Sequence, residues 1–373
     1  MTIAQISELL NDVTPQALGE EAVSVVDLST LVALGDSVLA SNTATDAWLK
    51  TLTLRIGKTI LGYRKYRNKL ADMVLDDFEY GSIVQKINIH LIPAQDDPSV
   101  DLNDGESVDH YKVNNPKVEQ KLFASRTPYM FVVTIQDKWL TEAFLSFEAM
   151  GSFISYIFGQ VRNSIEFSLE NLGRCCLANF ACETENVVNL VSLYNAEMNL
   201  TGGDALTAST ALHDKDFMAF AVGVMNEYSD RLTDMSTSYN DSSIERHTPY
   251  EEQRFRTLSM FRRRLETVVQ YEAFHDNFVT PENEDYIKTL NYWQGEQSPM
   301  TIIAKRASDQ TEVTLENVVA MLYDRRALGI YKKTEKIVNT PINAFGLFYN
   351  QAVHENELWF NDLSENFILF TLN

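Results

Sequence analysis

The chain has few cysteines and few positive charges. Only 3 of its 373 residues are cysteine, and Cys175, Cys176 and Cys182 lie close together without a CxxC pair. This arrangement excludes a disulfide framework and favours reduced, structural thiols. Lys and Arg number 31 against 52 Asp and Glu, which gives a net charge of −21. An acidic balance of this size argues against a nucleic-acid coat and against a protein that binds anionic membranes.

The sequence also lacks the motifs of common enzyme classes. Gly57-Lys58-Thr59 resembles the end of a phosphate-binding loop, but Leu52 stands where that loop needs a glycine. The 6 histidines show neither HExxH nor zinc-site spacing. No GxSxG elbow and no dinucleotide fingerprint is present. We therefore predict no catalytic residue, no metal and no cofactor, and favour a structural or binding protein over an enzyme.

A secretory leader and a membrane span are not expected either. The first Lys or Arg is Lys50, so the start of the chain has no basic region that precedes a leader's apolar core. The longest uncharged apolar stretch, Ala149 to Val161, is shorter than the about 20 residues that cross a bilayer. We expect a protein without a membrane partner that is cytoplasmic or assembled from the cytoplasm.

One long apolar periodicity dominates the middle of the chain. From Thr141 to Cys182, apolar side chains recur every three or four residues, which predicts a single helix. At 1.5 Å per residue this helix would be about 60 Å long, too long for one compact core, and would act as a strut. The apolar positions are Phe144, Phe147, Met150, Ile154, Ile157, Val161, Ile165, Leu169, Leu172, Cys176 and Phe180.

Charge is segregated along the first part of the chain. Residues 1–49 contain seven acids and no Lys or Arg, with short helical patterns at Ile3–Leu10 and Leu28–Leu39. Residues 50–69 then contain seven cations and no acid. Segregated charges of this kind can steer two surfaces together, although a solvated basic face is the alternative.

A long hairpin is predicted next. Ile87, Ile89 and Leu91 alternate with polar residues, which indicates a half-buried strand, and a second strand-rich run covers 118–135. The 24 residues 93–116 connect them and are acidic. Because an isolated two-stranded hairpin is marginal in water, this one needs a surface to lie on.

The remainder predicts a mixed α/β lobe over 186–335. A helical pattern runs from Asp216 to about Leu232, and Thr248-Pro249 with Glu251 predicts another helix start through a capping box. The apolar runs 321–323 and 367–372 predict buried strands.

With this order of parts, three groups of motifs carry a family resemblance. The first is Leu54 to Thr59 with the basic run Tyr63 to Arg67, the second is 118–120 leading through 134–136 and 140–144, and the third is 324–330 followed by 343–346 and 361–363. In these the chain resembles the major capsid (head) proteins of tailed bacteriophages that adopt the Hong Kong 97 type fold. The small short-tailed, phi-twenty-nine-like phages are the most similar group.

The resemblance implies an α+β fold with an N-terminal arm, an extended two-stranded loop (E-loop), a long spine helix, a peripheral (P) domain and an axial (A) domain. The implied divisions are 1–69 for the arm, 70–140 for the E-loop, 141–185 for the spine helix of the P domain, 186–335 for the A domain with part of the P domain, and 336–373 for returning strands of the P domain.

The implied function is that of a major capsid protein. Such subunits would self-assemble into hexamers and pentamers and form an icosahedral or prolate head shell around double-stranded DNA, without reading its sequence. The implied partners are other copies of the chain, a portal and a separate scaffolding protein, and the implied location is the virion. The alternatives are an encapsulin-like compartment shell and an intracellular enzyme with an unrecognised site.

The candidate site residues are contacts between subunits. We hypothesise that the acidic hairpin connection lies over the basic segment of a neighbouring subunit, because their charges are opposite and unmixed. The residues are Arg55, Lys58, Arg64, Lys65, Arg67 and Lys69 on the basic side, and Asp96, Asp97, Asp101, Asp104, Glu106 and Asp109 on the acidic side.

Overall fold

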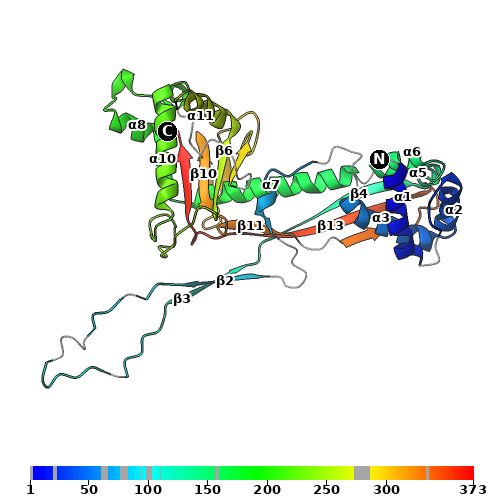
Figure 1. The fold of residues 1–373 in the computed structure, drawn as a ribbon, viewed down its shortest axis with the longest axis horizontal. Coiled ribbons are helices and arrows are strands. Elements are labelled where there is room, and N and C mark those ends of the chain that lie inside the picture. Colours follow the sequence, from blue (N-terminus) through cyan, green and yellow to red (C-terminus); the bar gives the residue numbers. More distant parts are fainter. Residues whose placement is uncertain are drawn as a thin grey trace. The chain divides into compact units, whose positions relative to one another are not determined.

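The chain folds into two compact units (Figure 1). Unit 1 comprises Met1–Glu79, Arg126–Gly173 and Ile330–Leu358, and unit 2 comprises Tyr80–Ser125, Arg174–Gly329 and Trp359–Asn373. Helix α7 (Gly159–Glu183) and the strands β11 (Leu328–Tyr331) and β13 (Phe348–Asn361) contribute residues to both. The computed structural model describes residues 3–19, 23–59, 66–75, 83–92, 94–97, 103–109, 111–155, 159–272, 286–332 and 336–373.

Unit 1 contains a helical core built largely from the N-terminal residues. Trp48 and Phe144 meet there with ring centroids 5.3 Å apart, and both side chains are buried. Gly35 lets this happen, because a Cβ at that position would lie 2.7 Å from the Cβ of Phe144. The described residues between 3 and 59, which lie within the expected N-terminal arm, are largely helical. The helices are α1 (Ile3–Leu18), α2 (Leu28–Leu39), α3 (Asn42–Thr59), α5 (Asp137–Ala143) and α6 (Phe147–Phe153).

The prediction of a single helix over 141–182 is wrong for the first part of that range. The chain leaves the helix after α5, where Phe144 is buried against Trp48 and Leu145 is 64% exposed. It restarts at α6, because the Ser146 hydroxyl accepts a hydrogen bond from the Ala149 amide at 3.1 Å and caps the new helix. The long helix is α7, of 25 residues and about 38 Å. Residues 156–158 lie outside the described part.

Unit 1 also contains a sheet ordered β1-β11-β13-β12, with β4 pairing the β13 strand as well. The β4–β13 ladder is antiparallel and continuous from Gln136 opposite Phe348 to Arg126 opposite Leu358. Short β1 is parallel to β11. The strands are β1 (Val74–Leu75), β4 (Arg126–Gln136), β11 (Leu328–Tyr331), β12 (Lys336–Asn339) and β13, and a 3-10 turn covers Ala71–Met73.

Unit 2 is organised around a sheet ordered β5-β14-β10-β6-β7 (Figure 1). Its middle strands are wholly buried, since helices cover them: Tyr228 of α10 packs edge-on against Phe370, and α11 contacts β6. The strands are β5 (Val187–Asn189), β6 (Gln253–Leu258), β7 (Ile287–Leu290), β10 (Val318–Asp324) and β14 (Phe367–Thr371). The helices are α8 (Leu190–Glu197), α9 (Ala208–Ala211), α10 (Lys215–Arg231) and α11 (Ser259–Glu272), with a 3-10 turn at Gly202–Asp204.

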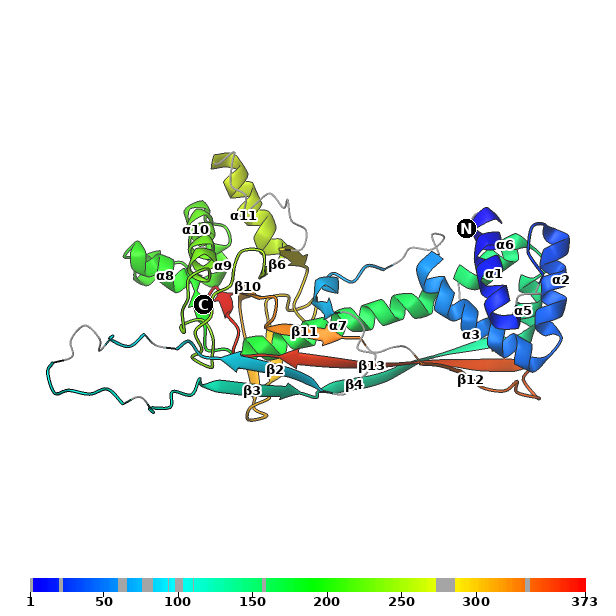
Figure 2. The same ribbon diagram turned by 60° about the horizontal axis from the view of Figure 1, so that its bottom comes forward.

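Two hairpins complete unit 2. One is short, from β8 (Ile302–Lys305) and β9 (Glu312–Leu315). The other pairs β2 (Val84–Ile89) with β3 (Val118–Phe123) and carries the long acidic connection (Figure 2). None of the helices among the described residues combines the length and apolar character needed to cross a membrane.

Several sequence predictions for unit 2 are confirmed and one is wrong. The buried strands β10 and β14 and the helix α10 lie where their patterns placed them. The helix predicted to start at Thr248 does not form, and the chain turns there into β6. The Thr248 hydroxyl is buried and donates to Asp324 at 2.8 Å, so it does not cap a helix.

Candidate interaction surface

The hairpin β2–β3 presents two very different faces. Its strands pair antiparallel, with Ile89 opposite Val118 and Ile87 opposite Gln120. Alternate residues therefore point to the same face. One face carries apolar side chains that are more than half exposed: Ile87 (58%), Ile89 (61%), Val118 (52%) and Leu122 (59%), continued beyond β2 by Leu91 (57%).

The other face of the hairpin is mainly polar, and it is the face that packs on the rest of unit 2. Its apolar members are Val84 and Phe123, and the Phe123 ring lies 5.5 Å from the ring of Phe360. Asn88, between the two exposed isoleucines, is only 1% exposed. The predicted alternation is thus confirmed, but the covered positions are Asn88, which is buried, and Lys86 and His90, which are partly buried, instead of the isoleucines. The hairpin covers its polar side within its own subunit and leaves its apolar side uncovered.

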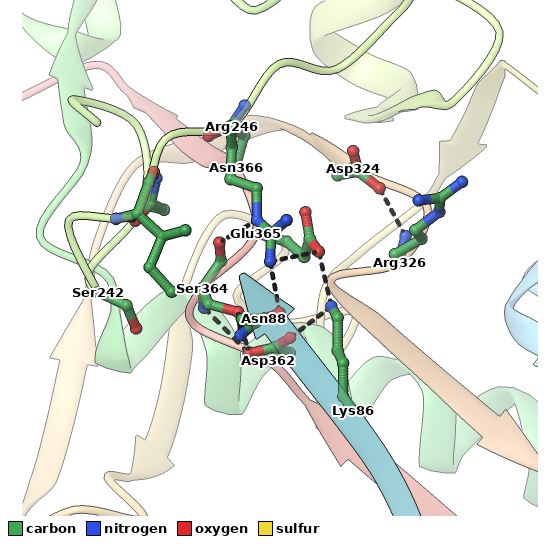
Figure 3. A network of polar contacts seen from close by, with 12 residues as sticks. Lys86, Asn88, Ser242, Arg246, Asp324, Arg326, Asp362, Ser364, Glu365 and Asn366 are labelled. Atoms are coloured by element: carbon green, nitrogen blue, oxygen red, sulfur yellow. Dashed lines mark hydrogen bonds and ion pairs between the residues drawn. The ribbon is translucent and has the colours of Figure 1, made fainter. Parts of the chain in front are cut away.

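Lys86 is the centre of the contacts on the buried face (Figure 3). Its ammonium group contacts Asp362 and lies 2.7 Å from Oε1 of Glu365. Both acids are buried, at 0% and 5% exposure. From the paired strand, the Lys121 ammonium reaches the other oxygen of Asp362 at 3.1 Å and donates to Ser242 at 3.1 Å. Three segments distant in the sequence meet here.

Arg246 and Asn88 extend this network (Figure 3). The Arg246 guanidinium donates to the Asn88 side-chain oxygen and lies 3.6 Å from Glu365. Asn88 in turn donates its amide N–H to the Ser364 hydroxyl at 2.9 Å. We refer to Lys86, Asn88, Lys121, Arg246, Asp362, Ser364 and Glu365 together as the hairpin anchor.

The acids of the anchor are held by a tight turn between β13 and β14. Asp362 accepts hydrogen bonds from the Ser364 amide at 3.0 Å and from the Ser364 hydroxyl at 2.7 Å. Its own amide donates to the Ala327 carbonyl at 2.6 Å. Burial by itself raises the pKa of Asp362. The charge and hydrogen bond of Lys86, together with two hydrogen bonds from Ser364, lower it by more, so the pKa lies below its usual value.

A histidine lies where the hairpin opens into its connection. His90 Nε2 is 3.1 Å from Glu119 on the paired strand, and its Nδ1 is 3.5 Å from Glu245. Lys117 also contacts Glu119 at 3.3 Å. The hydrogen bond from His90, followed by that from Lys117, keeps the pKa of Glu119 below its usual value. The hairpin is thus tied to the loop before Arg246 at a second point.

The acidic candidate residues lie on the connection between the two strands. Asp96, Asp97, Asp104, Glu106 and Asp109 are all exposed. Local turns shape this segment: the Asn103 amide donates to Glu106 at 3.2 Å, and Asp109 accepts from the Tyr111 amide at 2.9 Å. The predicted residue Asp101 lies outside the described residues.

The basic candidate residues belong to unit 1, and only two of them have described side chains. Arg67 is exposed and Lys69 is partly buried. Their segment is fixed against α7, because Glu170 accepts from the Tyr66 hydroxyl at 2.7 Å and from the Lys69 amide at 3.0 Å. Arg64 and Lys65 lie outside the described residues, as do the side chains of Arg55 and Lys58 in α3. The pairing of acidic and basic segments stays a prediction.

Sequence reasoning did not find the hairpin anchor. Its members come from residues 86–121, 242–246 and 362–365, and one sequence cannot show that these segments meet. A polar set repeating every second residue in β2, with another lysine on β3, was the available indication. Among the described residues, no group of three or more His, Cys, Asp and Glu side chains could hold a metal ion.

A hairpin that is anchored on its polar side leaves an apolar face that another surface can cover. Two solved structures with similar folds come from phages. The capsid structure of Staphylococcus phage Andhra has 12% identity and a TM-score of 0.55, covering 85% of this chain and 87% of that one. A chain from the structure of the head fiber and inner core protein gp22 of native bacteriophage P68 has 14% identity and a TM-score of 0.51, with the same coverage. The fold is the α+β Hong Kong 97 type of phage capsids.

The family follows from the sequence itself. The family model of the Phi29-like phage major capsid protein matches residues 6–371, so the chain belongs to that family. It is a shell-forming structural protein of a phage virion, and neither alternative, the compartment shell or the enzyme, is favoured. A comparison with curated proteins found no match.

Proposed function

We propose that this chain assembles into hexamers and pentamers that close into an icosahedral or prolate head shell around double-stranded DNA. The observation that carries the proposal is the uncovered apolar face of the β2–β3 hairpin. A two-stranded hairpin is marginal in water, and its apolar face gains stability only when another surface covers it. A second copy of the chain is the occupant that a homo-oligomeric shell supplies.

The geometry of such an assembly is heterologous. A projecting hairpin on one copy and a different receiving surface on the next form a head-to-tail contact, and contacts of this type close into rings. Obligate interfaces bury roughly 2,000–5,000 Å² each, so many modest contacts add up to a stable shell. We further propose that a portal and a separate scaffolding protein take part, and that assembly occurs in the host cytoplasm.

The test is electron microscopy of the purified chain, alone and with candidate scaffolding protein. We expect closed shells with five-fold and six-fold clusters of subunits. A protein that stays monomeric under all of these conditions would contradict the proposal. Shells that purify with a portal and a genome, and not with a protein cargo, would distinguish a phage head from an enzyme compartment.

The acidic hairpin connection is proposed to lie over the basic segment of a neighbouring subunit. The exposure of Asp96, Asp104 and Glu106 supports this, as does the exposure of Arg67. Individual exposed ion pairs contribute about 0–1 kcal/mol and weaken with salt, so they would set the register of the contact more than its strength. We also propose the domain boundaries that the family resemblance implies for the arm, the E-loop, the spine helix, the P domain and the A domain.

Charge reversal tests this pairing. Changing Arg64, Lys65 and Arg67 to Glu should lower the yield of shells and leave the circular dichroism of the monomer intact. A matched control reverses three lysines elsewhere, at Lys138, Lys305 and Lys336, and should assemble normally. Equal yields from both triple variants would eliminate the pairing.

We also propose that the excess negative charge keeps packaged DNA from adhering to the shell. The net charge of −21 supports this, because a like-charged wall repels phosphates. Binding to duplex DNA can be measured in a salt series. Submicromolar binding that weakens steeply as salt rises would show a cationic binding surface and contradict the idea.

A further inference from the structure

The hairpin anchor is an unusual way to attach an amphipathic hairpin. A hairpin with one apolar face ordinarily buries that face in its own core. Here the buried face carries Lys86, Asn88 and Lys121, while Ile87 and Ile89 remain exposed. Burying charged groups costs desolvation free energy, and apolar side chains would attach the hairpin without that cost. The polar attachment therefore needs a reason other than stability alone.

The polar contacts can fix the direction in which the hairpin points. Hydrogen bonds and ion pairs require particular distances and angles, whereas apolar contacts tolerate sliding. Lys86 contacts two acids at once, and Asn88 joins Ser364 to Arg246. Both strands are held, because Lys121 of β3 and Lys86 of β2 contact the two oxygens of the same carboxylate, that of Asp362. Contacts on both strands oppose rotation of the hairpin as well as its detachment.

The receiving groups are themselves rigid. Asp362 is fixed by two hydrogen bonds from Ser364 and by the contact of its amide with Ala327. Asn366, at the end of the same turn, donates to the Thr248 hydroxyl at 3.1 Å. The turn leads directly into β14, a strand of the unit 2 sheet. The hairpin is thus fixed relative to that sheet.

We infer that the hairpin anchor is a positioning device: Lys86, Asn88 and Arg246 fix the direction of the hairpin in the free subunit, so that its apolar face is presented to the neighbour before contact. This inference rests on the proposed assembly function. A pre-set hairpin loses little conformational freedom when the neighbour binds, which favours assembly over aggregation of an exposed apolar strand pair.

The direct test measures hairpin direction in unassembled subunits. Spin labels at Gln120→Cys and Met235→Cys, in a Cys175→Ser background, report the distance between the hairpin and the body of unit 2. The wild-type anchor should give a narrow distance distribution. Lys86→Met should broaden it about twofold or more, because a buried ion-pair network has lost its central cation.

Two comparison variants make the result specific. Lys112→Met removes the same charge from the exposed connection and should leave the distribution narrow. Asn88→Ala removes hydrogen bonds without leaving an unpaired charge, and it should also broaden the distance distribution. This variant supplies the test if Lys86→Met fails to fold. Unchanged widths in a folded Lys86→Met or Asn88→Ala protein would overturn the inference. Broadening together with loss of the near-ultraviolet circular dichroism of the whole subunit would also overturn it, since the anchor would then be a general structural element.

Failure of this inference can be told apart from failure of the proposed function. Ile89→Ser with Val118→Ser changes only the outward face, so its distance distribution should remain narrow. Its assembly reports on the interface, whereas the Lys86→Met distribution reports on the anchor. An anchor that does not affect direction would leave the interface result untouched, and the reverse also holds.

Discussion

Ile89 and Val118 face each other across the β2–β3 hairpin, and both side chains are more than half exposed. Covering the exposed half of each by a neighbouring subunit would contribute about 1–1.5 kcal/mol. We predict that replacing both with serine leaves the monomer folded and raises the concentration needed for assembly more than about tenfold. Sedimentation velocity measures the amounts of monomer and of assembled shell.

The control for this prediction uses polar positions of the same hairpin face. Gln85 and Gln120 are exposed on the outward side, and serine at both should assemble as the wild type does. Equal assembly of the isoleucine/valine variant and the glutamine variant would show that the apolar face is not an interface.

The direction of the hairpin should depend on pH only in acid. The pKa of Asp362 is lowered in the folded protein, from a usual value of 3.8, because Lys86 and Ser364 outweigh the effect of burial. A lowered carboxyl pKa stabilises the docked hairpin above the unfolded value and loses this contribution as the pH falls through the folded value.

The expected result is a spin-label distance distribution that is unchanged between about pH 7 and pH 5 and broadens only below about pH 3.8. Broadening that begins above pH 5 would show that another group controls the anchor. Asp362→Asn should be broad already at neutral pH, because an amide replaces the carboxylate that faces two lysines.

The contact between Phe144 and the N-terminal helices should support unit 1. Phe144 is 3% exposed and packs on Trp48 and Gly35. Phe144→Ala should lower the free energy of unfolding by about 3–5 kcal/mol, the usual cost of emptying a buried aromatic site. Leu145→Ala is the matched control, since the neighbouring side chain is 64% exposed and should cost less than about 0.5 kcal/mol. Urea unfolding measures the free energy of unfolding of both variants. Similar decreases in the two variants would show that Phe144 is not part of the core.

Thiol accessibility should separate the three cysteines. Burial raises the pKa of all three thiols, but Cys175 is exposed to solvent whereas Cys176 and Cys182 are buried. We predict that one thiol reacts rapidly with a disulfide reagent at neutral pH and that the other two react only on unfolding. Cys175→Ser should abolish the rapid phase. A rapid phase that survives this change would mean that α7 is more open than described.

Local patterns predicted the elements whose cause is local. The uninterrupted apolar runs at 321–323 and 367–372 required buried strands, and the helical period of 216–232 gave α10. The break before α6 was missed because Phe144, Phe147 and Met150 keep the helical spacing across it. Ser146, a good N-cap, was the indication that a new helix begins there.

The hairpin anchor could not be predicted, because one sequence does not show which distant segments meet. Alternation in β2 predicted a strand with two faces, but which face is buried is decided by Asp362 and Glu365, far away in the chain. Thr248 shows the same limit, since its capping pattern was overridden by a buried hydrogen bond to Asp324. In both cases a distant carboxylate outweighs the local preference.

The central claim is that the outward face of the hairpin is covered by another copy of the chain in the assembled shell. A cryo-electron microscopy map of that shell at side-chain resolution tests it most directly. We predict that Ile87, Ile89, Val118 and Leu122 of each subunit are buried against a neighbour, with the Lys86 contacts to Asp362 and Glu365 retained. A map in which these four side chains remain exposed to solvent would contradict the account.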